Sequence, residues 1–140
     1  MIDATEVERA LIGKLAADAA LAASLPDGVF YDLAPIGSTK FAIVSLSTSR
    51  GLYELNDAET LRTLVYVVKA VVLGTSSTNV AAADKRMQEL IDRQPLNLPP
   101  EAGATLMVAR WVDRIRYTET ANNDTWQHRG ARYEITVTPA

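Results

Sequence analysis

Cysteine is absent from this 140-residue chain, and histidine occurs only once, as His128. Without cysteine the protein has no disulfide bonds, thiol nucleophiles or cysteine metal sites. A lone histidine makes a poor metal site, so we interpret His128 as a surface or strand-end residue. The sequence also lacks a glycine-rich phosphate loop and a serine in a nucleophile elbow. We therefore predict that the protein is not an enzyme and that it holds no cofactor and no metal.

Strong net charge and long apolar runs are missing as well. The net charge of −3 is mild, so general binding to nucleic acid or to an anionic membrane is not expected. No apolar run is long enough to cross a bilayer. Asp3, Glu6 and Glu8 stand where a secretory signal needs basic residues, so we expect the protein to be made and kept in the cytoplasm.

The composition is otherwise ordinary for a globular protein, with 48% apolar and 22% charged residues. A chain of this length buries enough surface for one core. We find no internal repeat, low-complexity tract or domain linker. We therefore predict a single domain that spans residues 1–140.

The longest stretch rich in β-branched residues is residues 59–74. Its leucines and valines also have a spacing that fits a helix, but five valines and Thr63 favour a long strand. Arg62 and Lys69 are the only charges inside it, and both faces of the strand are apolar. We expect both faces to be covered, either by helices of this chain or by another subunit.

Apolar spacing, helix caps and turn residues divide the rest of the chain. They predict helices at residues 3–17, 18–25 and 77–93, strands at residues 29–33, 41–48, 107–117 and 130–138, and loops at residues 49–57, 94–103 and 118–126. The main elements follow in the order α-β-β-β-α-β-β. This pattern predicts an α+β fold.

Three arginines, Arg110, Arg114 and Arg116, fall on one face of the strand predicted at residues 107–117. They fit either a strip that faces phosphates or a ladder of ion pairs with a neighbouring strand or subunit, which makes them candidates for a subunit or partner interface. We favour ion pairs, because Glu134 lies on the polar face of the partner strand and no aromatic residues interleave to stack on bases.

An apolar group, Leu52, Tyr53 and Leu55, lies among polar residues in the loop predicted at residues 49–57. It either packs back on its own chain or contacts a partner. The sequence leaves both alternatives open. Trp126, close to His128, is a further candidate for a subunit or partner interface.

Several segments together carry a family resemblance. They are Leu15-Ala16-Ala17-Asp18, residues 21–25, Val29-Phe30-Tyr31-Asp32-Leu33-Ala34-Pro35, Phe41-Ala42-Ile43-Val44, Met87-Gln88-Glu89-Leu90, and Asp124, His128 and Arg129 ahead of the closing strand. Taken in order, they resemble the tail terminator, or tail completion, proteins of long-tailed bacteriophages and gene transfer agents.

The resemblance implies a mixed, mostly antiparallel sheet with two main helices packed on it. It also implies a homo-hexameric ring at the head-proximal end of the tail tube in the virion. Such a ring stops tube polymerisation and joins the tail tube protein to the head-side connector protein. DNA passes through its lumen without specific binding. Assembly would take place in the cytoplasm of the bacterial host, with no role for a membrane.

The acidic residues Glu54, Asp57 and Glu59 are candidates to face that lumen, where negative charge repels DNA and lets it slide. Two alternatives stay open. One is another head-tail connector or minor tail protein. The other is a small cytosolic enzyme or ligand-binding domain with a pocket near Arg110, Trp111 and His128.

Overall fold

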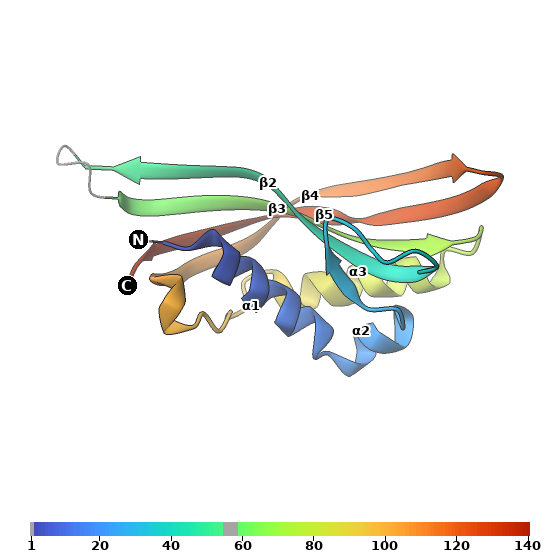
Figure 1. Cartoon of the computed structure of the whole chain (residues 1–140), viewed down its shortest axis with the longest axis horizontal. Helices are drawn as coiled ribbons and strands as arrows, with labels where there is room; N and C mark the ends of the chain where they lie inside the picture. Colours follow the sequence, from blue (N-terminus) through green and yellow to red (C-terminus); the bar gives the residue numbers. More distant parts are fainter. Residues whose placement is uncertain (1, 55–58) are drawn as a thin grey trace.

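All helices lie on one face of a single sheet (Figure 1). The computed structural model describes residues 2–54 and 59–140, which form five strands in the order β1-β2-β3-β5-β4. The helices are α1 (Ala4–Ala16), α2 (Ala19–Ser24), α3 (Thr78–Ile91) and the short 3-10 helix η1 (Pro100–Ala102). The strands are β1 (Val29–Tyr31), β2 (Lys40–Tyr53), β3 (Glu59–Leu73), β4 (Ala104–Ala121) and β5 (Asp124–Pro139).

Only the pairing of β1 with β2 is parallel, and the other strand pairs are antiparallel. The predicted fold class, the order of the elements and the mixed, mostly antiparallel sheet are therefore confirmed.

The first two helices begin at aspartates, as their sequences predict. The carboxylate of Asp3 accepts a hydrogen bond from the backbone N–H of Thr5, and that of Asp18 from Leu21, each at 2.9 Å. One apolar stripe then faces the sheet, and its buried members are Val7, Leu11, Leu15 and Leu21.

Polar contacts fix α3 on the sheet. The buried carboxylate of Asp84 accepts a hydrogen bond from Arg129 on β5 at 3.1 Å. At the C-terminal end of the helix, the carboxylate of Asp92 accepts one from the backbone N–H of Trp111 on β4 at 2.8 Å. These contacts tie α3 to the two strands that lie beneath it.

The central strand is β3, as residues 59–74 predict, and its two faces differ. The residues toward the helices are all buried: Leu64, Tyr66, Val68, Ala70 and Val72. On the other side, Val65, Val67 and Leu73 are only half-buried, whereas Val71, beside the loop of residues 32–38, is buried. We call this second side the open face, because no helix within the described residues covers it (Figure 1).

Two loop predictions are wrong where strands continue. Strand β2 runs on to Tyr53, so residues 49–53 are strand and not loop. Strands β4 and β5 take up most of residues 118–126, and only Asn122 and Asn123 form the turn, with φ of 52° and 67°. Two positive φ values are typical of the two-residue type I′ hairpin. In both hairpins cross-strand hydrogen bonds hold polar residues in strands, which an apolar pattern does not reveal.

The prediction that Arg110, Arg114 and Arg116 share one face is also wrong. A register shift between Trp111 and Asp113 inserts one extra residue into β4. A shift of one residue moves all later side chains to the opposite face. Arg110 therefore lies on the open face, whereas Arg114 and Arg116 lie on the helix side.

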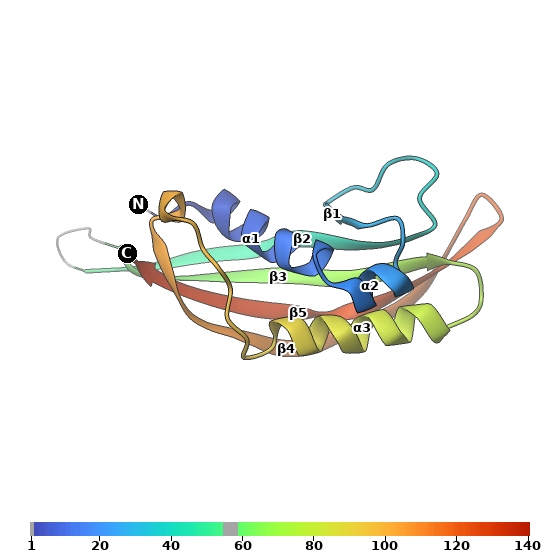
Figure 2. The ribbon, with the colours of Figure 1, turned by 90° about the horizontal axis from the view of Figure 1, so that it is seen from below.

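The two long hairpins reach out at opposite ends of the molecule (Figures 1 and 2). The β2–β3 hairpin marks one end. The β4–β5 hairpin and the loop of residues 32–38 mark the other. Within the described chain, no helix is both long and apolar enough to cross a membrane.

Candidate functional site

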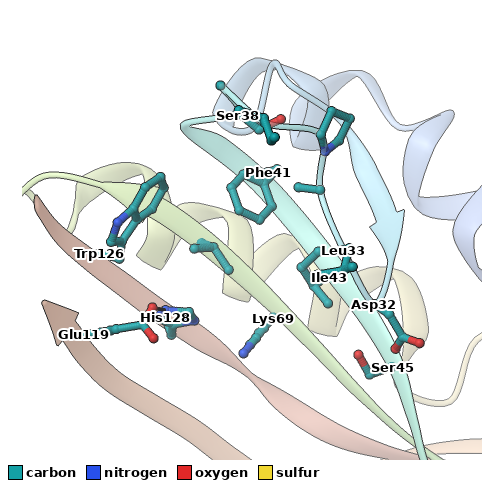
Figure 3. A pocket seen from close by; sticks show the side chains of 15 residues that line it. Asp32, Leu33, Ser38, Phe41, Ile43, Ser45, Lys69, Glu119, Trp126 and His128 are labelled. Carbon is teal, nitrogen blue, oxygen red and sulfur yellow. Dashed lines mark hydrogen bonds and ion pairs between the residues drawn. The ribbon is translucent and has the colours of Figure 1, made fainter. Parts of the chain in front are cut away.

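A groove of about 440 Å³ lies on the open face beside the loop of residues 32–38 (Figure 3). The loop forms one wall, and strands β2, β3 and β5 form the floor. Its apolar lining includes Leu33, Ile36, Phe41, Ile43, Val71 and Trp126. We call this site the groove.

Aromatic rings build one end of the groove. The ring centroid of Phe41 lies 6.4 Å from that of Phe30 and 6.3 Å from that of Trp126, both edge to face. The strand register sets this arrangement, because Phe41 pairs with Val71 and Trp126 pairs with Leu73. Trp126, a predicted interface residue, is therefore part of the groove.

His128 is buried in the sheet at 8% exposure, so the prediction of a surface residue is wrong. The hairpin register places it between Val71 and Tyr117, and its ring stacks on Tyr117 at 4.3 Å. Its Nε2 lies 3.1 Å from the carboxylate of Glu119, so Nε2–H donates the hydrogen bond, because an ionised carboxylate can only accept one. Burial lowers the pKa of His128, so the imidazole is neutral at pH 7.

Lys69 and Asp32 are charged residues of the groove without an ion-pair partner among residues 2–54 and 59–140. The ammonium of Lys69 donates to the Tyr117 hydroxyl at 2.7 Å and lies 5.2 Å from the centre of that ring. Asp32 follows β1 and lies near Ser45 in Figure 3. Glu119 also lines the groove, where its carboxylate accepts the hydrogen bond from His128, so the groove carries one ammonium group and two carboxylates. Lys69 and Asp32 are the two of these charges that are free of an ion pair with a described residue or a bond to His128. No group of three His, Asp or Glu side chains in the described parts of the chain is placed to hold a metal ion.

The predicted apolar group lies at the other end of the molecule. Leu52 is 60% exposed and Tyr53 is 56% exposed, although the ring of Tyr53 lies over Gly51 of its own strand. Leu55 lies outside the described residues. Contact of this group with a partner stays a prediction.

Of the predicted acidic residues, Glu54 is exposed, and Asp57 lies outside the described residues. Glu59 is paired: its carboxylate accepts hydrogen bonds from Nε and Nη2 of Arg62 at 3.1 and 2.7 Å. A position facing a lumen stays a prediction for all three.

The predicted ion pairing on β4 is confirmed for Arg110, whose guanidinium lies 2.9 Å from the carboxylate of Glu134. Arg132 and Asp113 form the next pair on the open face, at 2.8 and 3.0 Å. Arg114 and Arg116 form no ion pair with any described residue.

The described residues do not bring Arg110, Trp111 and His128 together in one pocket. Trp111 pairs with Tyr133 on the helix side, Arg110 points to the open face, and only His128 lines the groove. The sequence did hold one signal for the groove that we missed, because Leu33 and Ile36 are apolar residues within a proline- and glycine-containing turn.

Solved structures align with almost the whole chain. One is a chain of a structure described as the virion of a native gene transfer agent particle, with a TM-score of 0.69 and 18% sequence identity over 95% of this chain and 96% of that chain. The protein shares its fold with that virion component. A second solved structure aligns with a TM-score of 0.57 and 12% identity over 96% of both chains. No protein-family model and no curated protein matches the sequence.

Proposed function

We propose that this protein is a structural component of a phage-like particle and acts by assembly rather than catalysis. The observation that carries the proposal is the match of the fold to a chain of a gene transfer agent virion over nearly the full length of both. The segments that resemble tail terminators point in the same direction.

The specific role that we propose is that of a tail terminator. Six copies form a ring at the head-proximal end of the tail tube, stop its polymerisation and join it to the head-side connector protein. The partners are other copies of this chain, the tail tube protein and the connector, while DNA passes through the ring without specific binding. Assembly takes place in the cytoplasm of the bacterial host.

The open face supports a role in self-association. Val65 and Val67 are half-buried there, and no described helix covers them. Burial of such apolar surface at a subunit contact stabilises an oligomer by roughly 25 cal/mol per Å². The exposed pairs Arg110–Glu134 and Arg132–Asp113 border this surface and are suited to the polar rim of an interface.

Native mass spectrometry and negative-stain imaging of the purified protein test the assembly. We expect a ring of six copies of 15.2 kDa each. A compact monomer whose melting temperature rises with a small ligand would instead support a ligand-binding domain.

Deletion of the gene from a particle-producing strain tests the specific role. A tail terminator is needed to stop the tube, so we expect tails of uncontrolled length. Tails of normal length that are detached from heads would support the alternative of a head-tail connector.

A further inference from the structure

We propose that the groove binds the end of the β2–β3 hairpin of a neighbouring copy of this chain. The hairpin end is defined here as Arg50, Leu52, Tyr53 and Glu54. The inference rests on the self-association in the proposed function, and it assigns the two surfaces that meet.

Both surfaces expose apolar side chains that the described chain leaves uncovered. At the groove, Leu33 is 83% exposed and Ile36 is fully exposed. At the hairpin end, side chains alternate along β2, so Leu52 and Tyr53 point to opposite sides. The hairpin end therefore presents one large apolar side chain to the loop wall and one to the floor of the groove.

The charges of the two surfaces are complementary. In the groove, Asp32 lies on the β1 side of β2, and Lys69 lies on the β3 side, where it pairs with Ile43. The hairpin end carries the exposed residues Arg50 and Glu54. None of these four charges is in an ion pair within residues 2–54 and 59–140. Glu54 is thus matched by Lys69 of the next copy, and Arg50 by Asp32.

The positions of the two surfaces set the kind of assembly. They lie at opposite ends of the molecule, so no chain can fill its own groove (Figures 1 and 2). A contact between two different surfaces of identical copies is head to tail, and it closes into a ring when the rotation permits. This is the symmetry that the proposed function requires.

Pairing of sheet edges is the main competing contact, and β4 is poorly suited to it. Two register shifts interrupt its ladder, one between Leu106 and Val108 and one between Trp111 and Asp113. Charged residues occur from Arg110 to Glu119, and such charges and bulges are the devices by which edge strands avoid pairing.

Charge reversal tests the contact. We expect Lys69→Glu or Glu54→Lys alone to weaken association about tenfold, and the double variant to recover most of the loss. Lys85→Glu on the exposed side of α3 makes the same charge change away from both surfaces, and it should leave association unchanged. Recovery in the double variant separates a lost contact from lost folding.

Disulfide trapping gives a second, geometric test, because the chain has no cysteine of its own. Ser45→Cys in the groove and Leu52→Cys at the hairpin end, combined in one chain, should link successive copies into a ladder on oxidation. A disulfide requires the two Cα atoms to come within about 7 Å. The control pair Lys85→Cys with Leu52→Cys should remain unlinked.

The outcomes separate this inference from the proposed function. The groove contact alone is overturned if the wild type forms a ring, the variant with Ser45→Cys and Leu52→Cys gives no disulfide ladder, and the charge-reversal variants assemble as wild type does. A wild-type protein that stays monomeric overturns both. Glu54 cannot both contact the groove of a neighbouring copy and face the lumen of the ring. A disulfide ladder would therefore also contradict the prediction that Glu54 faces the lumen.

Discussion

The two faces of strand β3 differ in a way that separates folding from assembly. Val68 faces the helices and is completely buried, whereas its neighbour Val67 faces the open side and is half-buried. Both belong to one strand and are the same residue type. The sequence therefore supplies apolar side chains on both faces, but the helices of this chain cover only one of them.

The apolar residues of a strand therefore indicate how much surface has to be covered, but they do not indicate whether a helix or another subunit covers it. The helix side packs against α1, α2 and α3 and holds the fold together. The open side keeps apolar surface beside charged pairs, a combination typical of a subunit contact. Substitutions that act on one face only test whether the helix side determines folding and the open side determines assembly.

The largest effect is expected for Val68→Asp. An unpaired carboxylate buried at this position costs about 4 kcal/mol or more, a large part of the stability of a small domain. Urea denaturation should show a protein that is mostly unfolded. The matched variant Val67→Asp should change the free energy of unfolding by less than about 1 kcal/mol, and equal losses for both variants would contradict the comparison.

The next largest loss of stability is expected at Gly130, where β5 lies close to β3. A Cβ atom there would meet the backbone of Val68 and Lys69, so the two strands would have to move apart. Gly130→Ala is expected to destabilise the fold by about 1–3 kcal/mol in thermal or urea denaturation. Gly13→Ala is the control: a Cβ on this helical residue meets nothing, and the variant should gain about 0.5–1 kcal/mol.

The ion pair between α2 and α3 predicts a pH-dependent effect. Two hydrogen bonds from Arg86, at 2.9 and 2.7 Å, lower the pKa of Asp18 from 3.8 to about 2. A lowered carboxyl pKa stabilises the fold above about pH 4 and loses this contribution as the pH falls through 2. Because the pair is partly exposed, Arg86→Met should lower the stability at pH 7 only slightly.

Melting curves of wild type and Arg86→Met between pH 7 and about pH 2 check this prediction. The difference between the two proteins should disappear at the acid end. A difference that persists at pH 2 would show that Arg86 acts through packing and not through the charge of Asp18.

The smallest effect concerns His128 on the open face. Burial lowers its pKa below 6.5, so the unfolded chain takes up a proton before the folded chain does, and stability falls as the pH drops below 6.5. His128→Phe keeps a ring to stack on Tyr117 and removes this proton. The melting temperature of this variant should depend less on pH just below 6.5 than that of wild type. Equal pH dependence of the two melting temperatures would contradict the lowered pKa of His128.

Local signals in the sequence were enough to predict the helices and the central strand β3. The carboxylates of Asp3 and Asp18 cap helices as their positions predict, and the β-branched residues of 59–74 form β3. These features depend on neighbours in the chain. For that reason they can be read without the tertiary structure.

The length of the hairpins and the face of each arginine depend on pairing between strands. Arg50 continues β2 because it pairs with Thr63, and Arg114 changes face because one residue bulges before it. Neither fact leaves an apolar pattern in the sequence. The groove also depends on strand pairing, since Asp32, Lys69 and Trp126 meet only after four strands assemble, and Leu33 and Ile36 are its one local signal.

The most direct test of the open face as an assembly surface is sedimentation of wild type and Val67→Asp at matched concentrations, with melting curves alongside. We expect wild type to sediment as an oligomer and Val67→Asp as a monomer that melts like the wild-type fold. A Val67→Asp protein that assembles as wild type does, or that unfolds as Val68→Asp does, would contradict this account.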